Sequence, residues 1–154
     1  MQDVPENQSN EAPAAQVTEI ELQLRWGDMD PLNHVNNVQF ARLLEETRVR
    51  AMDLWFGGDS RAVLGPILIA RQDIEYVRPL HYSTDPAKVR IWISRVGGSS
   101  FAFDYEMLDA WGNRVALAKT VCVAADLETE SSRAIPDDAK RVLNERLAAP
   151  APMR

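Results

Sequence analysis

The sequence predicts an α+β fold in which an antiparallel sheet of about five strands wraps around one long central helix, followed by a short C-terminal helix. Three observations lead to this prediction. A long helical pattern of apolar residues occurs near residues 40–55. Four strand-like segments follow it, and turn-forming residues separate them. One further strand-like segment precedes the helix, so one sheet and one covering helix form two layers.

The chain of 154 residues is 45% hydrophobic, which fits one globular domain. We place that domain at residues 17–148. Residues 1–16 are rich in Gln, Asn, Glu, Pro and Ala and predict a disordered N-terminal tail. Residues 149–154 are expected to form a C-terminal tail.

The composition excludes several classes of partner. A net charge of -6 gives no positive field for nucleic acid, and no apolar run reaches the ~20 residues of a membrane helix. Cys122 is the only cysteine, which favours the reducing cytoplasm. Because His34 and His81 are far apart in the sequence and have no cysteine partner, we expect no metal site, and we expect no cofactor.

The first strand is expected over residues 17–26, where Ile20, Leu22, Leu24 and Trp26 alternate with polar residues. Residues 27–37 are dense in turn formers, and Asn36 suits a helix N-cap. The following segment is predicted to be a helix with one apolar face that ends near Gly57. Its members are Phe40, Leu43, Leu44, Thr47, Ala51, Leu54 and Trp55.

The later strands are predicted at residues 67–80, 87–96, 101–109 and 114–126, and a short helix opens at Pro136. One helix covers a five-stranded sheet only partly. The open edges and remaining apolar surface therefore favour a homodimer or homotetramer.

The loop before the helix holds the residues most suited to chemistry. It places the carboxylates of Asp28 and Asp30 and the imidazole of His34 beside a helix N-terminus. Free backbone N–H groups there carry partial positive charge and can bind an oxyanion or polarise a carbonyl. Acyl transfer requires such an arrangement.

This segment resembles the signature of hotdog-fold acyl-CoA thioesterases of the hydroxybenzoyl-CoA thioesterase type. The resemblance covers about residues 20–135 and is carried by Asp28-Met29-Asp30-Pro31, His34-Val35-Asn36-Asn37, and Phe40, Arg42, Leu44 and Glu45. It implies a hotdog fold and hydrolysis of an acyl-CoA to a free acid and coenzyme A. By this resemblance Asp30 is the catalytic carboxylate, as nucleophile or general base, and the Asn37 backbone N–H polarises the thioester carbonyl. Asp28 is then a structural partner of a loop N–H or an arginine.

Other candidates have weaker sequence signals. His34 could orient water or the substrate carbonyl, or only hold the loop. Glu45 could position water or close the acyl pocket, or be an ordinary surface group. The turn with Arg95, Gly98, Ser99 and Ser100 could contact the pantetheine arm, or be a plain hairpin turn.

Two other functions fit the same fold. A hydroxyacyl dehydratase would pair His34 with Glu45 as acid and base, but the Pro-Gly stretch usual in such dehydratases is absent and Asp30-Pro31 stands instead. A non-catalytic acyl-CoA or acyl-carrier binding module would use the fold to hold pantetheine, with Asp30 as a turn residue.

Overall fold

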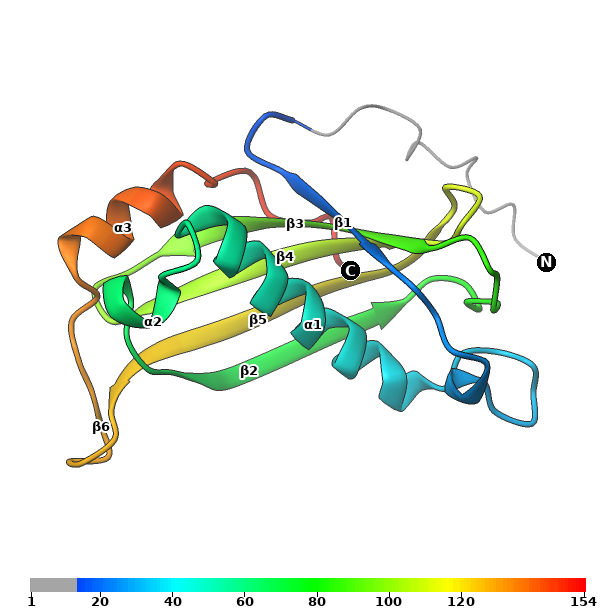
Figure 1. Cartoon of the computed structure of the whole chain (residues 1–154), viewed down its shortest axis with the longest axis horizontal. Coiled ribbons are helices and arrows are strands. Elements are labelled where there is room, and N and C mark those ends of the chain that lie inside the picture. The colour runs from blue at the N-terminus through cyan, green and yellow to red at the C-terminus, as the bar shows by residue number, and fades with distance from the viewer. Residues whose placement is uncertain (1–13) are drawn as a thin grey trace.

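A curled antiparallel sheet surrounds the long helix α1 in the computed structural model, which describes residues 14–154 (Figure 1). Most of the predicted tail, residues 1–13, lies outside the described residues, and residues 14–16 form a turn. The elements are β1 (Thr18–Leu22), the 3-10 turn η1 (Trp26–Asp28), α1 (Asn37–Trp55), α2 (Ser60–Val63), β2 (Ile67–Tyr76), β3 (Ala87–Val96), β4 (Ser100–Leu108), β5 (Arg114–Asp126), β6 (Ser131–Ser132) and α3 (Asp137–Asn144).

The five main strands follow the order β1-β3-β4-β5-β2, all paired antiparallel, and the short β6 pairs with the end of β5. β1 and β2 are therefore the two edges of the sheet, although no other strand separates them in sequence. α1 crosses the concave face between them (Figure 1). This arrangement confirms the predicted α+β fold.

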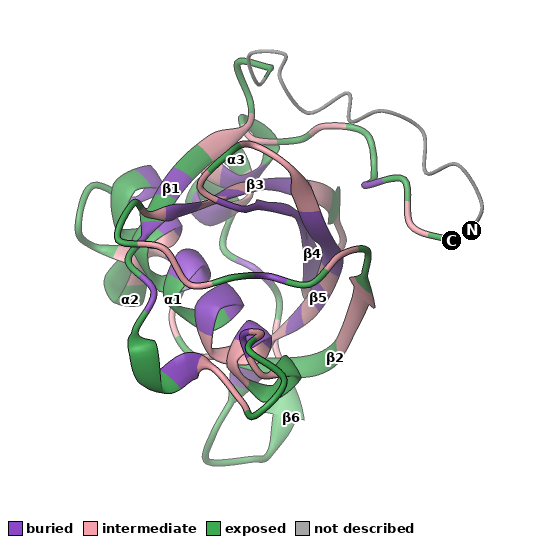
Figure 2. Ribbon diagram, turned by 90° about the vertical axis from the view of Figure 1, so that its right-hand side faces the viewer, coloured by how far each residue is buried: buried purple, intermediate pink, exposed green. Residues whose placement is uncertain are grey.

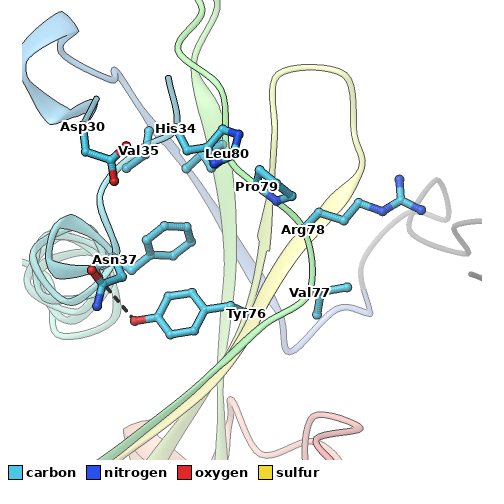
Figure 3. A pocket seen from close by; sticks show the side chains of 10 residues that line it. Asp30, His34, Val35, Asn37, Tyr76, Val77, Arg78, Pro79 and Leu80 are labelled. Carbon is cyan, nitrogen blue, oxygen red and sulfur yellow. Dashed lines mark hydrogen bonds between the residues drawn. The ribbon is translucent and has the colours of Figure 1, made fainter. Parts of the chain in front are cut away.

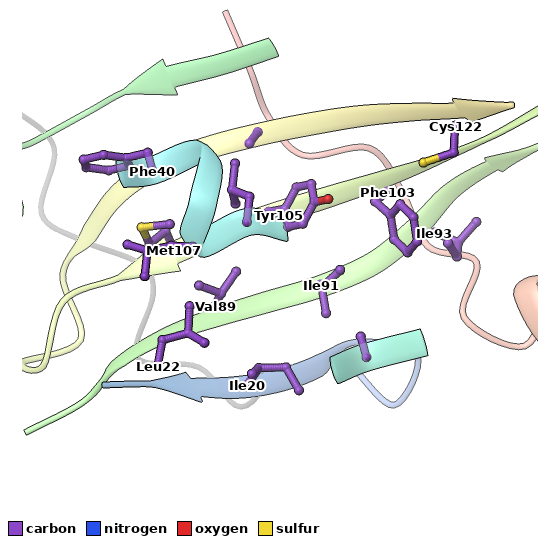
Figure 4. Close-up of a cluster of buried hydrophobic side chains, with 14 of the residues drawn as sticks. Ile20, Leu22, Phe40, Val89, Ile91, Ile93, Phe103, Tyr105, Met107 and Cys122 are labelled. Carbon is purple, nitrogen blue, oxygen red and sulfur yellow. The ribbon is translucent and has the colours of Figure 1, made fainter. Parts of the chain in front are cut away.

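The main core lies between α1 and the concave face of the sheet (Figure 2). Alternate residues of β3 and β4 point inward, among them Ile91, Phe103 and Tyr105, and all three are fully buried (Figure 4). Trp55 stacks on Phe103 with ring centroids 6.0 Å apart. The period-2 pattern of the strands and the helical pattern of α1 thus meet in one apolar layer.

Two residues of α1 differ from the predicted pattern. Leu54, expected on the apolar face, is 64% exposed, whereas Arg48 is only 7% exposed. Because the sheet curls around α1, the shape of the sheet decides which side of the helix is covered. The long side chain of an arginine on the covered side can reach polar groups of the sheet.

The first strand is shorter than predicted, and Trp26 is not on its apolar face. Trp26 begins η1, is 72% exposed, and packs edge-to-face on Tyr82 at 5.6 Å. The strand ends where its pairing with β3 ends, at Leu22 opposite Ala87. β2 likewise ends at Tyr76, four residues before the predicted limit.

Residues 149–154, expected to form a tail, lie against the outer face of the sheet. The Trp92 indole donates to the Ala149 carbonyl at 2.9 Å, and the Ala151 N–H donates to the Asp104 carboxylate at 2.7 Å. Trp92 and Ala151 are buried together there. The segment therefore covers apolar surface that the single long helix leaves on the convex side.

Candidate functional site

The loop between η1 and α1 is a tight hairpin. A bridge joins Met29 to Val35, and the Asp30 N–H donates to the His34 carbonyl at 2.9 Å. Asn33, which closes the turn back onto the Asp30 carbonyl, has a left-handed φ of 60° that asparagine tolerates well. These backbone bonds fix Asp30 and His34 on either side of the turn.

Asp28 anchors this hairpin to the domain and is 1% exposed. Its carboxylate accepts from the Arg25 backbone at 2.9 Å and from the Arg25 and Arg42 guanidinium groups at 3.0 and 2.8 Å. Burial by itself would raise the pKa of Asp28, but the Arg25 N–H and the two guanidinium groups outweigh it, and the pKa lies below its ordinary value. Asp28 has the structural role expected for it.

Asp30 has a more open environment and borders a cavity of about 350 Å³. Its Oδ1 accepts from the Leu32 N–H at 2.9 Å, and its Oδ2 lies 3.5 Å from the Asn36 side-chain amide. The carboxylate therefore forms a local turn and also faces open space (Figure 3). The residues around the cavity are Asp30, His34, Val35, Asn37, Phe40, Tyr76, Val77, Arg78, Pro79 and Leu80.

The N-terminus of α1 forms another part of the same cavity. Asn36 is the N-cap, and its side chain accepts from the Val38 N–H at 2.9 Å, while the Gln39 N–H donates to the Asn36 carbonyl. Within residues 14–154 the Asn37 N–H has no acceptor. The Asn37 carbonyl accepts from the Tyr76 hydroxyl at 3.3 Å (Figure 3). One helix N–H thus remains available to a ligand beside Asp30.

The fold brings the two histidines together, contrary to their separation in the sequence. The His34 and His81 rings lie edge-to-face with centroids 5.1 Å apart. The contact forms because the Val35 N–H donates to the Leu80 carbonyl at 2.8 Å, which aligns the loop with the segment after β2. In the described part of the chain no three His, Cys, Asp or Glu side chains form a metal-binding group.

The other predicted site residues do not join this cavity within one chain. Glu45 is exposed on α1 and is not among the residues that line the cavity. The turn containing Arg95, Gly98, Ser99 and Ser100 lies at the opposite end of the sheet (Figure 1). Its backbone is held there, since the Ala124 N–H donates to Ser99 and the Ile135 N–H to Gly98.

Sequence reasoning missed the end of β2 and the segment that follows it. Tyr76, Arg78 and Leu80 line the cavity, and Tyr76 packs edge-to-face on Phe40 at 5.0 Å. Their residue types carry no motif, and the pairing of β2 with β5 together with the Val35–Leu80 backbone hydrogen bond brings them beside the loop. The rigid Pro79 in this segment was the one available sign of a positioned loop.

The chain belongs to the thioesterase-like superfamily, whose sequence model matches residues 24–143. Its fold is the hotdog fold of that superfamily. No curated protein matches the chain significantly. Among the residues that the structure describes, no helix is long and apolar enough to cross a membrane.

Solved structures share this fold at low sequence identity. A predicted thioesterase from Bacillus stearothermophilus has a TM-score of 0.76 and 24% identity over 88% of this chain and 99% of its own. A Thermus thermophilus thioesterase complexed with coenzyme A and Zn has a TM-score of 0.71 and 23% identity over 85% and 95%. A 1,4-dihydroxy-2-naphthoyl-CoA thioesterase from Synechocystis has a TM-score of 0.72 and 18% identity over 83% and 96%.

Proposed function

We propose that this protein hydrolyses an acyl-CoA thioester, with Asp30 as the catalytic carboxylate and the Asn37 N–H as the group that polarises the carbonyl. One observation carries the proposal. Asp30 and Asn37, whose helix N–H has no acceptor within residues 14–154, both line the same cavity in a member of the thioesterase-like superfamily. No cofactor is required for hydrolysis by this pair.

The proposed reaction uses these two groups at opposite ends of the carbonyl bond. The Asn37 N–H, at the positive end of α1, stabilises the oxygen as it gains negative charge. Asp30 either removes a proton from the attacking water or attacks the carbonyl carbon itself to form an anhydride that water then cleaves. In both routes the carbon–sulfur bond breaks, the sulfur leaves as the thiolate of coenzyme A, and the acid is released.

The comparisons support coenzyme A as the thiol carrier, because one structural neighbour is complexed with coenzyme A and another is named for an aromatic acyl-CoA substrate. We extend this to the hydroxybenzoyl-CoA thioesterase type for the present chain. His34 belongs to the proposed site as a group that orients water or substrate. Its contact with His81 supports a fixed ring position.

We also propose that the active form is a homodimer paired through β2, or a tetramer of such dimers. β2 is an edge strand and carries the exposed apolar side chains of Leu68, Ile69 and Tyr76. Two-fold antiparallel pairing would place the start of one β2 beside the end of the other. The start of β2 in the second copy would then lie beside Tyr76 of the first copy, which lines the Asp30 cavity. Leu68, at the start of β2, and Ser100 both pair with Val123 of β5. The predicted turn around Ser99 in the second copy would therefore approach the Asp30 cavity of the first.

The test is thiol release from short, medium, long and aromatic acyl-CoAs by wild type and Asp30→Asn. The variant keeps the side-chain shape but removes the anionic oxygen, and we expect a loss of about 100-fold or more in kcat. Asp59→Asn is the matched control, because Asp59 is exposed and its side chain makes no cap hydrogen bond. Wild-type activity in Asp30→Asn, or substrate binding without turnover in wild type, would contradict the proposal. The latter result would indicate a binding module.

A further inference from the structure

Arg78 follows the end of β2 and lines the same cavity as Asp30. Its backbone is fixed there. The Val77 and Arg78 N–H groups both donate to the Val115 carbonyl, at 2.8 and 3.1 Å, as in a β-bulge. A bulge turns side chains out of the regular alternation of a strand, and Pro79 directly after it has a fixed φ. The position from which the Arg78 side chain leaves the sheet is therefore well defined.

The Arg78 guanidinium is a cation without an anionic partner. None of the ion pairs or side-chain hydrogen bonds found in residues 14–154 includes it, and the side chain is only partly exposed. Among the residues around the cavity, Arg78 is the one lysine or arginine. Arg25 and Arg42, which contact the loop before α1, both pair with Asp28 instead. Arg78 is therefore the cation that this cavity offers to an anionic ligand.

Arg78 lies at some distance from the proposed reaction centre. Figure 3 shows the Tyr76 side chain pointing toward Asn37 and the Arg78 side chain pointing away from Asp30. The Tyr76 hydroxyl lies 3.3 Å from the Asn37 carbonyl. Two residues of extended chain span at most about 7 Å, and two long side chains that point apart each add about 6 Å. The guanidinium therefore lies up to about 20 Å from the start of α1.

This separation is comparable to the length of a pantetheine arm. In coenzyme A about 13 bonds join the sulfur to the first phosphorus atom, and each advances about 1.25 Å, so the extended arm is about 16 Å long. The 3′-phosphate of coenzyme A lies beyond the ribose and is further from the sulfur. An acyl thioester whose carbonyl lies at the Asn37 N–H can therefore place the first phosphate near Arg78.

We propose that Arg78 binds the phosphate at the end of the pantetheine arm, and that this contact gives the enzyme a preference for phosphorylated thiol carriers. The inference rests on the proposed thioesterase function and names the residue that recognises the anionic part of its substrate. The planar N–H donors of a guanidinium match the oxygens of a phosphate. β2 ends at Tyr76, so the proposed pairing of two β2 strands leaves Arg78 outside the paired residues.

The experiment measures kcat/KM for one acyl group on coenzyme A, dephospho-CoA, 4′-phosphopantetheine and pantetheine. Dephospho-CoA lacks only the 3′-phosphate, and pantetheine has no phosphate. In wild type we expect similar values for the phosphorylated carriers and a value about tenfold lower for pantetheine, mainly through a higher KM. In Arg78→Met the ratio of phosphopantetheine to pantetheine should fall to about one. Arg78→Lys keeps the charge and should retain part of the preference.

Arg141→Met is the matched control. Arg141 is exposed on α3 and pairs with Asp138, so its loss should leave the ratio at the wild-type value. Each ratio compares two substrates on one protein, so a partly unfolded variant does not distort it.

A wild-type ratio near one, or a ratio unchanged in Arg78→Met, would overturn the inference and leave the thioesterase proposal intact. A preference for coenzyme A over dephospho-CoA that disappears in Arg78→Met would move the contact to the 3′-phosphate and would also overturn it. If no thioester is hydrolysed, the thioesterase proposal fails. The affinities of thioether analogues of phosphopantetheine and pantetheine then test Arg78 separately.

Discussion

Asp28 and Asp30 differ in their surroundings although they are two residues apart in one loop. Asp28 is enclosed and bonded to two arginines, whereas Asp30 makes one short backbone bond and faces the cavity. A carboxylate with saturated acceptor sites stabilises a structure, and one with free oxygens can react. The same loop therefore holds one aspartate that stabilises the structure and one, Asp30, that we propose as the catalytic carboxylate.

Asp28→Asn should lower the free energy of unfolding by about 2 kcal/mol, because a buried carboxylate loses its charge-assisted hydrogen bonds from Arg25 and from the partly exposed Arg42. The pKa of Asp28 is lower in the folded chain than in the unfolded chain. Its contribution is therefore complete above the unfolded value of about 4 and is lost as the pH falls through the lower folded value. Urea unfolding from pH 6 down to acid should show this slope in wild type and a flatter one in the variant. Equal acid slopes would contradict the assignment.

Asn37→Pro tests the proposed backbone donor directly. Asn37 is the first residue of α1, where proline is well tolerated, and the extended conformation of Asn36, φ -61° and ψ 139°, suits a residue before proline. The variant removes the N–H together with the asparagine side chain, and we expect kcat to fall about 100-fold or more with little loss of stability. Asn37→Ala keeps the N–H and should be much milder. Similar activities for the two variants would rule out this donor.

At the scale of elements, the start of α1 links stability to the site. The Asn36 side chain caps the helix with its oxygen and reaches Asp30 with its amide nitrogen. Asn36→Ala should cost about 1 kcal/mol of stability, whereas Asn36→Asp keeps the cap and should cost only a few tenths. Both variants lose the donor to Asp30, and we expect both to be less active. Thermal unfolding and thiol release separate the effects; full activity in Asn36→Asp would exclude a role for the amide.

The elements themselves were largely predictable from local patterns. The helical spacing and the glycines after Trp55 gave α1, and turn residues marked the boundaries of β3, β4 and β5. The end of β1 was not predictable, because it depends on where pairing with β3 stops. The burial of Arg48 was missed for a related reason, since its three hydrogen-bond acceptors, Gln72, Tyr105 and Thr120, come from three strands and leave no pattern along the helix.

Some residues of the candidate site were likewise predictable from the sequence, and others were not. Asp30, His34 and Asn37 are close in sequence and could be proposed from it. Tyr76 and His81 join them through tertiary contacts that no local spacing encodes. The turn at Ser99 was proposed as a ligand contact, and within one chain it lies at the opposite end of the sheet. The proposed pairing of a second copy through β2 would bring it near.

For the whole molecule, the proposed dimer can be tested through the charges of β2. If the two-fold axis passes through Gln72, Arg71 of one copy lies opposite Asp73 of the other. Arg71→Glu should then weaken the dimer, because two carboxylates replace each ion pair, and Arg71→Glu combined with Asp73→Arg should restore it. Sedimentation analysis gives the oligomeric state. A dimer unaffected by Arg71→Glu, or not restored by the double change, would contradict pairing at this register.

The strand order also has a consequence for how the chain reaches its native state. β3, β4 and β5 form a continuous meander joined by short turns, so their contacts can form early at small loop-closure cost. β1 reaches β3 only across α1, α2 and the whole of β2, and β2 itself must cross to the opposite edge. The folding rate should therefore depend mainly on the meander. The edge strands should pair with the meander late and so complete the curled sheet around α1. β2, the strand proposed for self-association, is therefore also among the last to pair.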